Sequence, residues 1–252
     1  MLSVKNIPMA VIVLAAFFFS CGDAFAAFDP KSYVVVDGLL YTVDANGQKK
    51  QFEGAEVVEE ETAGGKIYWL AGDPEADGMN EGLYKGWKSG IYFFGGDGKF
   101  ISLLEKKHAD RSYVQFSPDG KQFILSSGTY VDREYLLYEF DGLKLQRAFG
   151  GISGVWIGPF RFAYTLIDES KNARHKDADF PGWLTVVVYD SAVDLLTTVL
   201  EATETEDFMM DRLNDETDEL VVTKFSVKDK KDWGDEEKIN VESIRVPIPA
   251  AG

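Results

Sequence analysis

Two histidines and their neighbouring charged residues are the first side chains whose types could support chemistry. His175 follows Arg174 and precedes Asp177 and Asp179, a combination that suits acid–base work or a metal, although a loop this polar also fits a solvated surface. His108 follows two lysines in a predicted turn, where solvation is the simpler interpretation. The sequence contains no G-x-S-x-G, H-E-x-x-H or P-loop pattern. We therefore predict no catalytic residue.

A second candidate is the acidic stretch that begins at Asp73. Asp73, Glu75 and Asp77 alternate along the chain and a glycine follows, which resembles the start of a calcium-binding loop. At the twelfth position of such a loop Tyr84 stands in place of the bidentate glutamate. The three acidic residues are the candidate calcium ligands, and an acidic surface loop is the alternative. No other cofactor is predicted.

Composition limits the classes of partner. Among 252 residues, 26 lysines and arginines face 42 aspartates and glutamates, which gives a net charge of −16. This balance argues against nucleic acid and against anionic lipid, since both are bound by clustered basic residues. A hydrophobic fraction of 45% excludes a largely disordered chain. The expected partner is another envelope protein or a small ligand.

The N-terminus has the pattern of a secretory signal. Lys5 precedes an apolar run over residues 9–19, and Ala24 and Ala26 supply the small residues of a cleavage site. An apolar run of this length is too short to span a membrane. We predict that residues 1–26 are removed and that residues 27–252 form one periplasmic or extracellular domain. The alternative is a lipoprotein anchored at Cys21, the only cysteine.

Short apolar segments rich in β-branched and aromatic residues predict an all-β fold. Asn-Gly and Asp-Gly pairs between them mark tight hairpin turns, as at Asn46, Asp97, Asp119 and Asp141. The only helix that we predict covers residues 203–213. It lies in the acidic stretch 201–220, which suits a solvated face or a surface that steers a basic partner.

A strand–turn–strand unit repeats along the chain, which is typical of propeller blades. We predict blades over residues 57–104, 112–149, 154–200 and 206–247, with residues 33–52 as part of another. Four or five blades are expected. The last unit lacks a clear fourth strand, so the N-terminal strands could close the propeller there. The alternative is an open antiparallel β-sandwich.

One motif adds a resemblance. The segment from Phe116 through Ser-Pro-Asp-Gly-Lys to Leu125 resembles the first hairpin of WD-like β-propeller repeat proteins of the bacterial cell envelope. The match covers one blade, over residues 112–149. It implies that this turn joins the two inner strands of a blade, and it implies no chemistry.

Long inserts fall between the second and third strands of each predicted blade. They cover residues 73–89, 129–134, 168–182 and 228–238, and a propeller register would gather them on one face. Aromatic and charged side chains there predict a recognition patch. Its candidate residues are Tyr84, Trp87, Tyr130, Arg174, His175, Trp183 and Trp233. The alternative is that each tryptophan folds back onto its own blade.

These observations favour a non-enzymatic binding or scaffold module that recognises a protein or ligand through the aromatic loops. One alternative is a propeller-based hydrolase that uses loop carboxylates such as Asp177, Asp179 and Asp232. A structural accessory protein is the other. Two or more carboxylates that converge in a pocket would favour the hydrolase.

Overall fold

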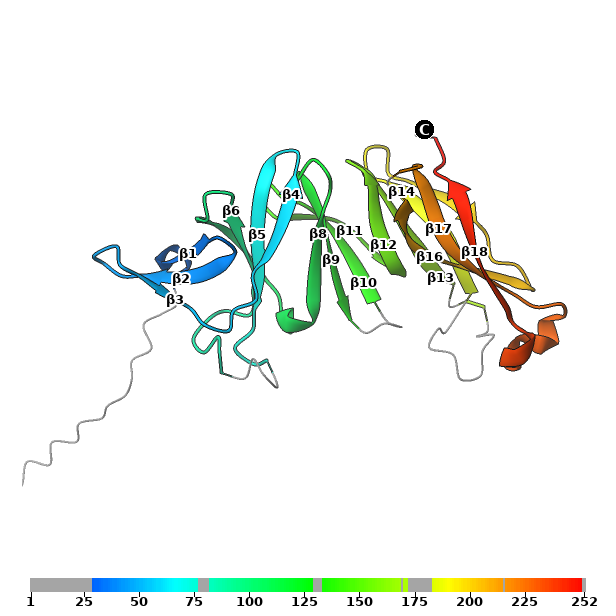
Figure 1. Ribbon diagram of the computed structural model, residues 1–252, viewed down its shortest axis with the longest axis horizontal. Helices are drawn as coiled ribbons and strands as arrows, with labels where there is room; N and C mark the ends of the chain where they lie inside the picture. The colour runs from blue at the N-terminus through cyan, green and yellow to red at the C-terminus, as the bar shows by residue number, and fades with distance from the viewer. Residues whose placement is uncertain are drawn as a thin grey trace, which may run out of the picture.

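The computed structural model describes residues 29–76, 82–128, 133–168, 170–171, 183–214 and 216–250. The predicted signal segment and Cys21 lie outside this part of the chain. Five antiparallel sheets and a few short 3-10 turns make up the described residues, so the all-β prediction is confirmed. Figure 1 shows the five sheets side by side, in chain order from the N-terminal end to the C-terminal end.

Three sheets have four strands and the two end sheets have three, each with its strands paired in chain order. The first sheet contains β1 (Tyr33–Val36), β2 (Leu39–Val43) and β3 (Lys49–Gln51), and the second contains β4 (Val58–Thr62), β5 (Gly65–Gly72), β6 (Gly90–Gly95) and β7 (Phe100–Glu105). The third contains β8 (Ser112–Phe116), β9 (Gln122–Gly128), β10 (Arg133–Glu139) and β11 (Lys144–Gly150). The fourth contains β12 (Ile152–Gly158), β13 (Arg161–Asp168), β14 (Trp183–Asp190) and β15 (Leu195–Leu200), and the fifth contains β16 (Glu206–Asn214), β17 (Glu219–Ser226) and β18 (Asn240–Pro247). The 3-10 turns are η1 (Pro30–Ser32), η3 (Ala109–Arg111), η4 (Lys230–Gly234) and η5 (Glu236–Lys238).

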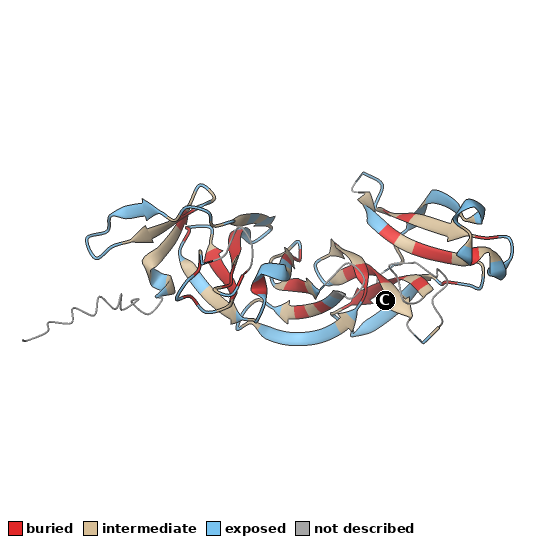
Figure 2. Ribbon diagram, turned by 90° about the horizontal axis from the view of Figure 1, so that it is seen from below, coloured by how far each residue is buried: buried red, intermediate tan, exposed pale blue. Residues whose placement is uncertain are grey.

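The four predicted blades match the second to fifth sheets, and residues 33–52 form the separate first sheet. The predicted closure does not occur in the described residues, because β1 to β3 pair with one another and not with the fifth sheet. Figures 1 and 2 place the first and fifth sheets at opposite ends of the row. The sheets are therefore blade-like, and the row that they form is open.

The core lies between neighbouring sheets. Each of four clusters of buried side chains joins two successive sheets, for example Val35 with Tyr92, Phe93 with Phe123, and Val188 with Phe208. The middle strands carry most of the buried residues, whereas outer strands such as β11 are largely exposed (Figure 2). Burial of aromatic area between sheets is the main force that aligns the row.

The Ser-Pro-Asp-Gly-Lys turn joins β8 to β9, the first two strands of the third sheet. Ser117 Oγ donates to Asp119 Oδ1 at 2.8 Å, and Gly120 adopts a φ of +73° that closes the turn. The Pro118 carbonyl accepts from the Ala63 N–H at 2.8 Å, and Gly120 lies against Thr62. The motif therefore shapes a turn and also docks the third sheet on the second.

The helix predicted over residues 203–213 is wrong, because this segment contains strand β16. Phe208 and Met210 are buried, Met209 between them is half-buried and Asp211 is exposed, while Asp207 at the start of the strand is buried as well. This alternation has the period of a strand, and β16 pairs with β17 and contacts β14. The many carboxylates of the acidic stretch made the apolar face of this strand difficult to recognise in the sequence.

No helix among the described residues is long and apolar enough to cross a membrane.

Candidate functional site

The aromatic residues of the first insert belong to the core. Tyr84 and Trp87 are 3% and 7% exposed, and their rings meet at 5.0 Å. The rings of Tyr33 in β1 and of Phe52, which directly follows β3, pack on Trp87 at centroid distances of 4.7 and 5.5 Å. Burial raises the pKa of the Tyr84 hydroxyl to about 12. Both residues therefore help to hold the first sheet on the second, and neither lies on an exposed surface as a loop patch would require.

The last tryptophan is also buried, and Trp183 is half-buried. Trp233 is 4% exposed and its indole N–H donates to the Glu204 carbonyl at 2.9 Å. Trp183 begins β14 and carries the Lys171 ammonium 4.3 Å from its ring centre. Trp233 thus matches the alternative in which the ring folds back onto its own blade, whereas the Trp87 ring is buried between its own blade and the first sheet. The reason is that a large ring gains more from burial than from solvent.

Several predicted residues lie outside the described part of the chain. They are Asp77, Tyr130, Arg174, His175, Asp177 and Asp179. The carboxylate of Asp232 pairs with the Lys238 ammonium at 3.3 Å and lines a pocket of the fifth sheet together with Glu237, but it belongs to no group of three possible metal ligands in the described residues.

The two described members of the predicted calcium loop diverge. Asp73 is 2% exposed, whereas Glu75 is exposed, and the Glu75 N–H donates to Asp73 Oδ1 at 3.0 Å. Among the described residues no group of three His, Cys, Asp or Glu side chains is placed to hold a metal ion. The feature that remains is the buried carboxylate of Asp73.

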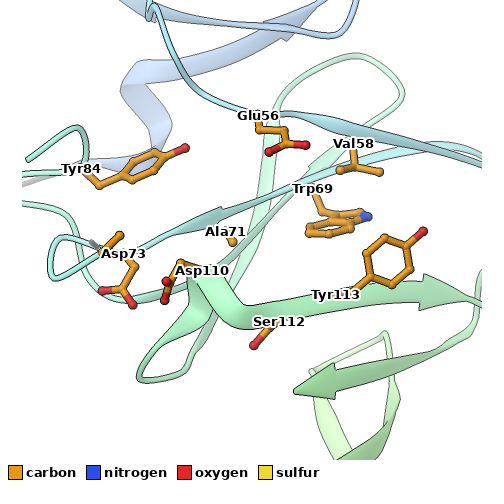
Figure 3. Close-up of a pocket in the computed structure, with 10 residues that line it drawn as sticks. Glu56, Val58, Trp69, Ala71, Asp73, Tyr84, Asp110, Ser112 and Tyr113 are labelled. Atoms are coloured by element: carbon orange, nitrogen blue, oxygen red, sulfur yellow. The ribbon is translucent and has the colours of Figure 1, made fainter. Parts of the chain in front are cut away.

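Asp73 lines a pocket of about 180 Å³ between the second and third sheets, which we call the interblade pocket (Figure 3). Its other walls come from β4, β5, η3 and β8 and from the segments beside them. The lining residues are Glu56, Val58, Trp69, Ala71, Asp73, Ala76, Tyr84, Asp110, Ser112 and Tyr113.

Two carboxyl groups meet at one end of the pocket. Figure 3 shows the side chains of Asp73 and Asp110 next to each other, one after β5 and the other in η3. Asp73 is buried and Asp110 is exposed at the mouth. Desolvation, followed by the hydrogen bond and the like charge of Asp73, raises the pKa of the Asp110 carboxyl, and Arg111 opposes this shift. Together they form a paired acid in which Asp110 holds its proton more tightly than an ordinary aspartate does.

Aromatic rings form the other end. Trp69 is buried on β5, and the half-exposed Tyr113 meets it edge to face at 5.6 Å. The Trp69 N–H lies near the carboxyl of Glu60 and lowers its pKa, but burial outweighs this and raises it overall. The pocket therefore combines an acidic end with an aromatic wall.

Local sequence explains how Asp73 is placed. A Cβ on Gly72 would lie 2.8 Å from the Tyr92 ring and 2.9 Å from the Trp87 ring. Only glycine allows the end of β5 to come this close to the two rings. The contact of Gly72 with the buried Trp87 therefore sets the position of Asp73, the next residue. On the other side Ala109 is fully buried and anchors η3, which presents Asp110. Trp87 thus contributes to the site as a positioning residue.

Sequence reasoning missed Trp69, Asp110 and Tyr113. Asp110 stands two residues after His108 in a short charged segment, and no motif distinguishes it. Its one signal is blade register, since it precedes the first strand of one blade while Asp73 follows the second strand of the blade before. Side chains from these two positions lie at the same end of neighbouring blades.

Comparisons with known proteins place the chain in no family. No family model and no curated protein matches it. Among solved structures, hydrazine synthase from Kuenenia stuttgartiensis aligns with 83% of this chain and 68% of its own at 13% identity and a TM-score of 0.40. TolB from Acinetobacter baumannii aligns over 83% and 49% at 13% identity and a TM-score of 0.37. The β-propeller domain of the trilobed protease from Pyrococcus furiosus aligns over 84% and 79% at 9% identity and a TM-score of 0.39.

The chain thus spans about half the length of the TolB structure. At these identities and TM-scores the similarities assign neither activity nor partner.

Proposed function

We propose that this protein is an exported, non-enzymatic binding module of the cell envelope whose binding site is the interblade pocket. The observation that carries the proposal is the buried carboxylate of Asp73, which faces the pocket with Oδ2 unbonded among the described residues. Buried polar atoms are almost always paired in a folded chain. An unpaired one in a pocket supports a ligand that pairs it.

This proposal moves the binding site from the predicted aromatic loops to the junction of two sheets. The pocket still lies beside the described end of the first insert, because Tyr84 forms part of its wall. A binding or scaffold role is retained from the sequence interpretation. The buried aromatic residues of the first insert help to position the site.

Filling the pocket tests the proposal. Ala71→Leu adds three carbons to the wall, and Ala192→Leu makes the same change in an exposed turn. Residues 27–252 of each variant are used to capture partners from envelope extract, with thermal unfolding as the check on folding. We expect Ala71→Leu to lose the captured molecule and Ala192→Leu to keep it. Capture that is equal in two folded variants would refute the interblade pocket as the site.

Export is part of the proposal and is tested by mass spectrometry of the chain recovered from its producing cells. A mature chain that begins at Ala27 supports the secretory signal. A lipidated N-terminal Cys21 would keep the envelope location but make the protein a lipoprotein. An intact N-terminus in the cytoplasmic fraction would contradict export.

A hydrolase is the second candidate, because Asp73 and Asp110 form a carboxyl pair with one raised pKa. Pairs of carboxyls in unlike environments serve as acid and base in glycoside cleavage. Turnover of a panel of aryl glycosides that disappears in Asp110→Asn would favour this candidate over the binding module. No turnover, with capture retained, supports the binding module.

A further inference from the structure

One oxygen of the buried Asp73 carboxylate in the interblade pocket lacks a hydrogen-bond donor, although two donors of the lining, Trp69 Nε1 and Ser112 Oγ, have no partner among the described residues. Asp73 is 2% exposed, and its Oδ1 accepts from the Glu75 N–H, but no N–H among the described residues reaches its Oδ2, and the carboxyl of Asp110 can donate to Asp73 only while it holds its own proton. A buried carboxylate oxygen without a donor costs free energy. A ligand that brings N–H donors would remove this cost.

The charge of the pocket defines the charge of that ligand. Asp73, Asp110 and Glu56 line it, and its described lining contains no lysine, arginine or histidine. The one basic group that acts on the pair is Arg111, which is exposed and lies outside the lining. The acidic end therefore favours a cation.

The walls distinguish an organic cation from a metal ion. The described residues offer no group of three ligands for a metal. A metal ion with a few waters would also make no favourable contact with the rings of Trp69 and Tyr113, which pack on each other. The volume of about 180 Å³ corresponds to roughly six water volumes. This space suits a cationic head on a short apolar stem, since aromatic walls attract both.

We infer that the interblade pocket binds a primary ammonium group carried on an apolar stem of about four or five carbons. This inference rests on the proposed function and names the chemistry of its ligand. The ammonium donates to Asp73 Oδ2 and to the carboxylate of Asp110, and the stem lies along Trp69 and Tyr113. Such a group is found in a free alkylamine and in the lysine side chain of a partner protein.

The test is calorimetric titration of residues 27–252 with n-butylammonium at neutral pH. 1-Butanol, which has the stem but no charge, is the matched ligand control, and calcium is titrated separately. We expect n-butylammonium to bind and 1-butanol to bind at least about tenfold more weakly, because charge-assisted hydrogen bonds are lost. Equal binding of both would overturn the inference, and so would tight binding of calcium without binding of the amine.

Two variants locate the site. Asp73→Asn keeps the acceptor for the Glu75 N–H and removes the charge, whereas Asp44→Asn makes the same change in an exposed turn where Asp44 Oδ1 accepts two backbone N–H groups at 2.8 Å. We expect Asp73→Asn to weaken n-butylammonium binding at least about tenfold and Asp44→Asn to leave it unchanged. If Asp73→Asn does not fold, Asp110→Asn at the exposed mouth takes its place. An unchanged affinity in the folded pocket variant would overturn the inference.

A third titration separates the two sources of the ammonium. Nα-acetyl-lysine methylamide carries the lysine side chain with a peptide backbone attached. Binding as tight as that of n-butylammonium supports a lysine of a partner protein, and binding only of the free amine supports a small ligand. If Ala71→Leu abolishes capture while no ammonium probe binds, the pocket remains the site and the ammonium inference alone fails. If the ammonium probes bind but Ala71→Leu captures the same molecule as wild type does, the captured partner binds elsewhere. The ammonium inference then holds and the proposed function fails.

Discussion

Two neighbouring sheet junctions of this protein are hollow, and they differ in how their polar groups are paired. The junction of the third and fourth sheets encloses about 280 Å³. There the Ser191 hydroxyl donates to Gln122 at 2.8 Å, and Asp194 accepts from the Tyr189 hydroxyl at 2.9 Å and pairs with Arg147. The smaller interblade pocket leaves Asp73 Oδ2 unpaired among the described residues. The comparison indicates that a buried polar atom without a hydrogen-bond partner is a better sign of a binding site than the volume of the pocket.

The aromatic packing around the two pockets also differs. At the third–fourth junction Trp156 lies 5.4 Å from Phe162, and its N–H donates to the Gln115 carbonyl at 2.9 Å. At the interblade pocket Tyr113 is 54% exposed. One junction therefore serves mainly stability, and the other keeps part of its wall available.

The largest expected difference between the two junctions is in the cost of truncating Trp156 and Tyr113 to alanine. Trp156→Ala removes a buried indole and its hydrogen bond and should cost about 3–5 kcal/mol of the free energy of unfolding. Tyr113→Ala should cost less than about 1 kcal/mol, because most of that side chain is already in solvent. Chemical denaturation of both variants measures the difference. Equal costs would show that the two junctions are not distinct in this way.

Gly120 tests the contact that docks the third sheet on the second. A Cβ at Gly120 would lie 2.7 Å from Thr62 Oγ1, whereas a Cβ at Gly142 has nothing within 4 Å, and both residues have φ above +70°. Gly120→Ala should cost about 1–3 kcal/mol more than Gly142→Ala, since backbone strain is common to both and the steric clash is not. Thermal and chemical unfolding provide the values, and similar costs would mean that Thr62 simply moves aside.

Asp73→Asn should raise the free energy of unfolding at neutral pH by up to about 1 kcal/mol. The variant keeps the bond from the Glu75 N–H and replaces an unpaired buried oxygen by an amide that can donate to Asp110. Asp44→Asn, the exposed control, should change it by less than about 0.5 kcal/mol. A gain in stability together with a loss of ligand would be typical of a binding residue that the fold does not need.

The smallest effect is a pH dependence. The pKa of Asp110 is raised in the folded protein, so the folded state holds the proton to a higher pH than the unfolded state does. Wild type should therefore lose stability relative to Asp110→Asn as the pH rises through the range between these pKa values. Asp73 and Arg111 are the charged groups that act on Asp110, Glu56 lines the same pocket, and Asp73→Asn should reduce the effect. Unfolding temperatures of the variants between about pH 3 and 7 measure it, and a constant difference would contradict the raised pKa.

The blades could be predicted because their signals are local. Turn pairs such as Asp119-Gly120 and short apolar runs place strand ends within a few residues, and the sheets match those ranges. The failure at β16 has an equally local cause, since a run of carboxylates concealed the alternation of Phe208 and Met210. The sequence of β16 contained the periodicity of a strand, but the charged residues outweighed it in the prediction.

The site could be predicted only in part, because it depends on contacts between distant segments. Asp73 was identified for its charge and spacing, but its partner Asp110 comes from the next blade and has no motif. For Trp87, exposure depends on whether the insert folds back, and a sequence pattern gives no information on this. Gly72 accommodates the Trp87 and Tyr92 rings, and this close contact becomes visible only in the folded structure.

The open row also has a consequence for how the protein comes apart. Each sheet shares its core with its immediate neighbours, and in the described part of the chain the first and fifth sheets do not pair. Stability in such a linear array is approximately a sum of unit and nearest-neighbour contributions, so the ends fray before the centre. Amide hydrogen exchange should therefore be slowest in β9 and β13 and become faster toward β3 and β18. Ligand held between the second and third sheets would protect both of these sheets and leave the fifth sheet free to open.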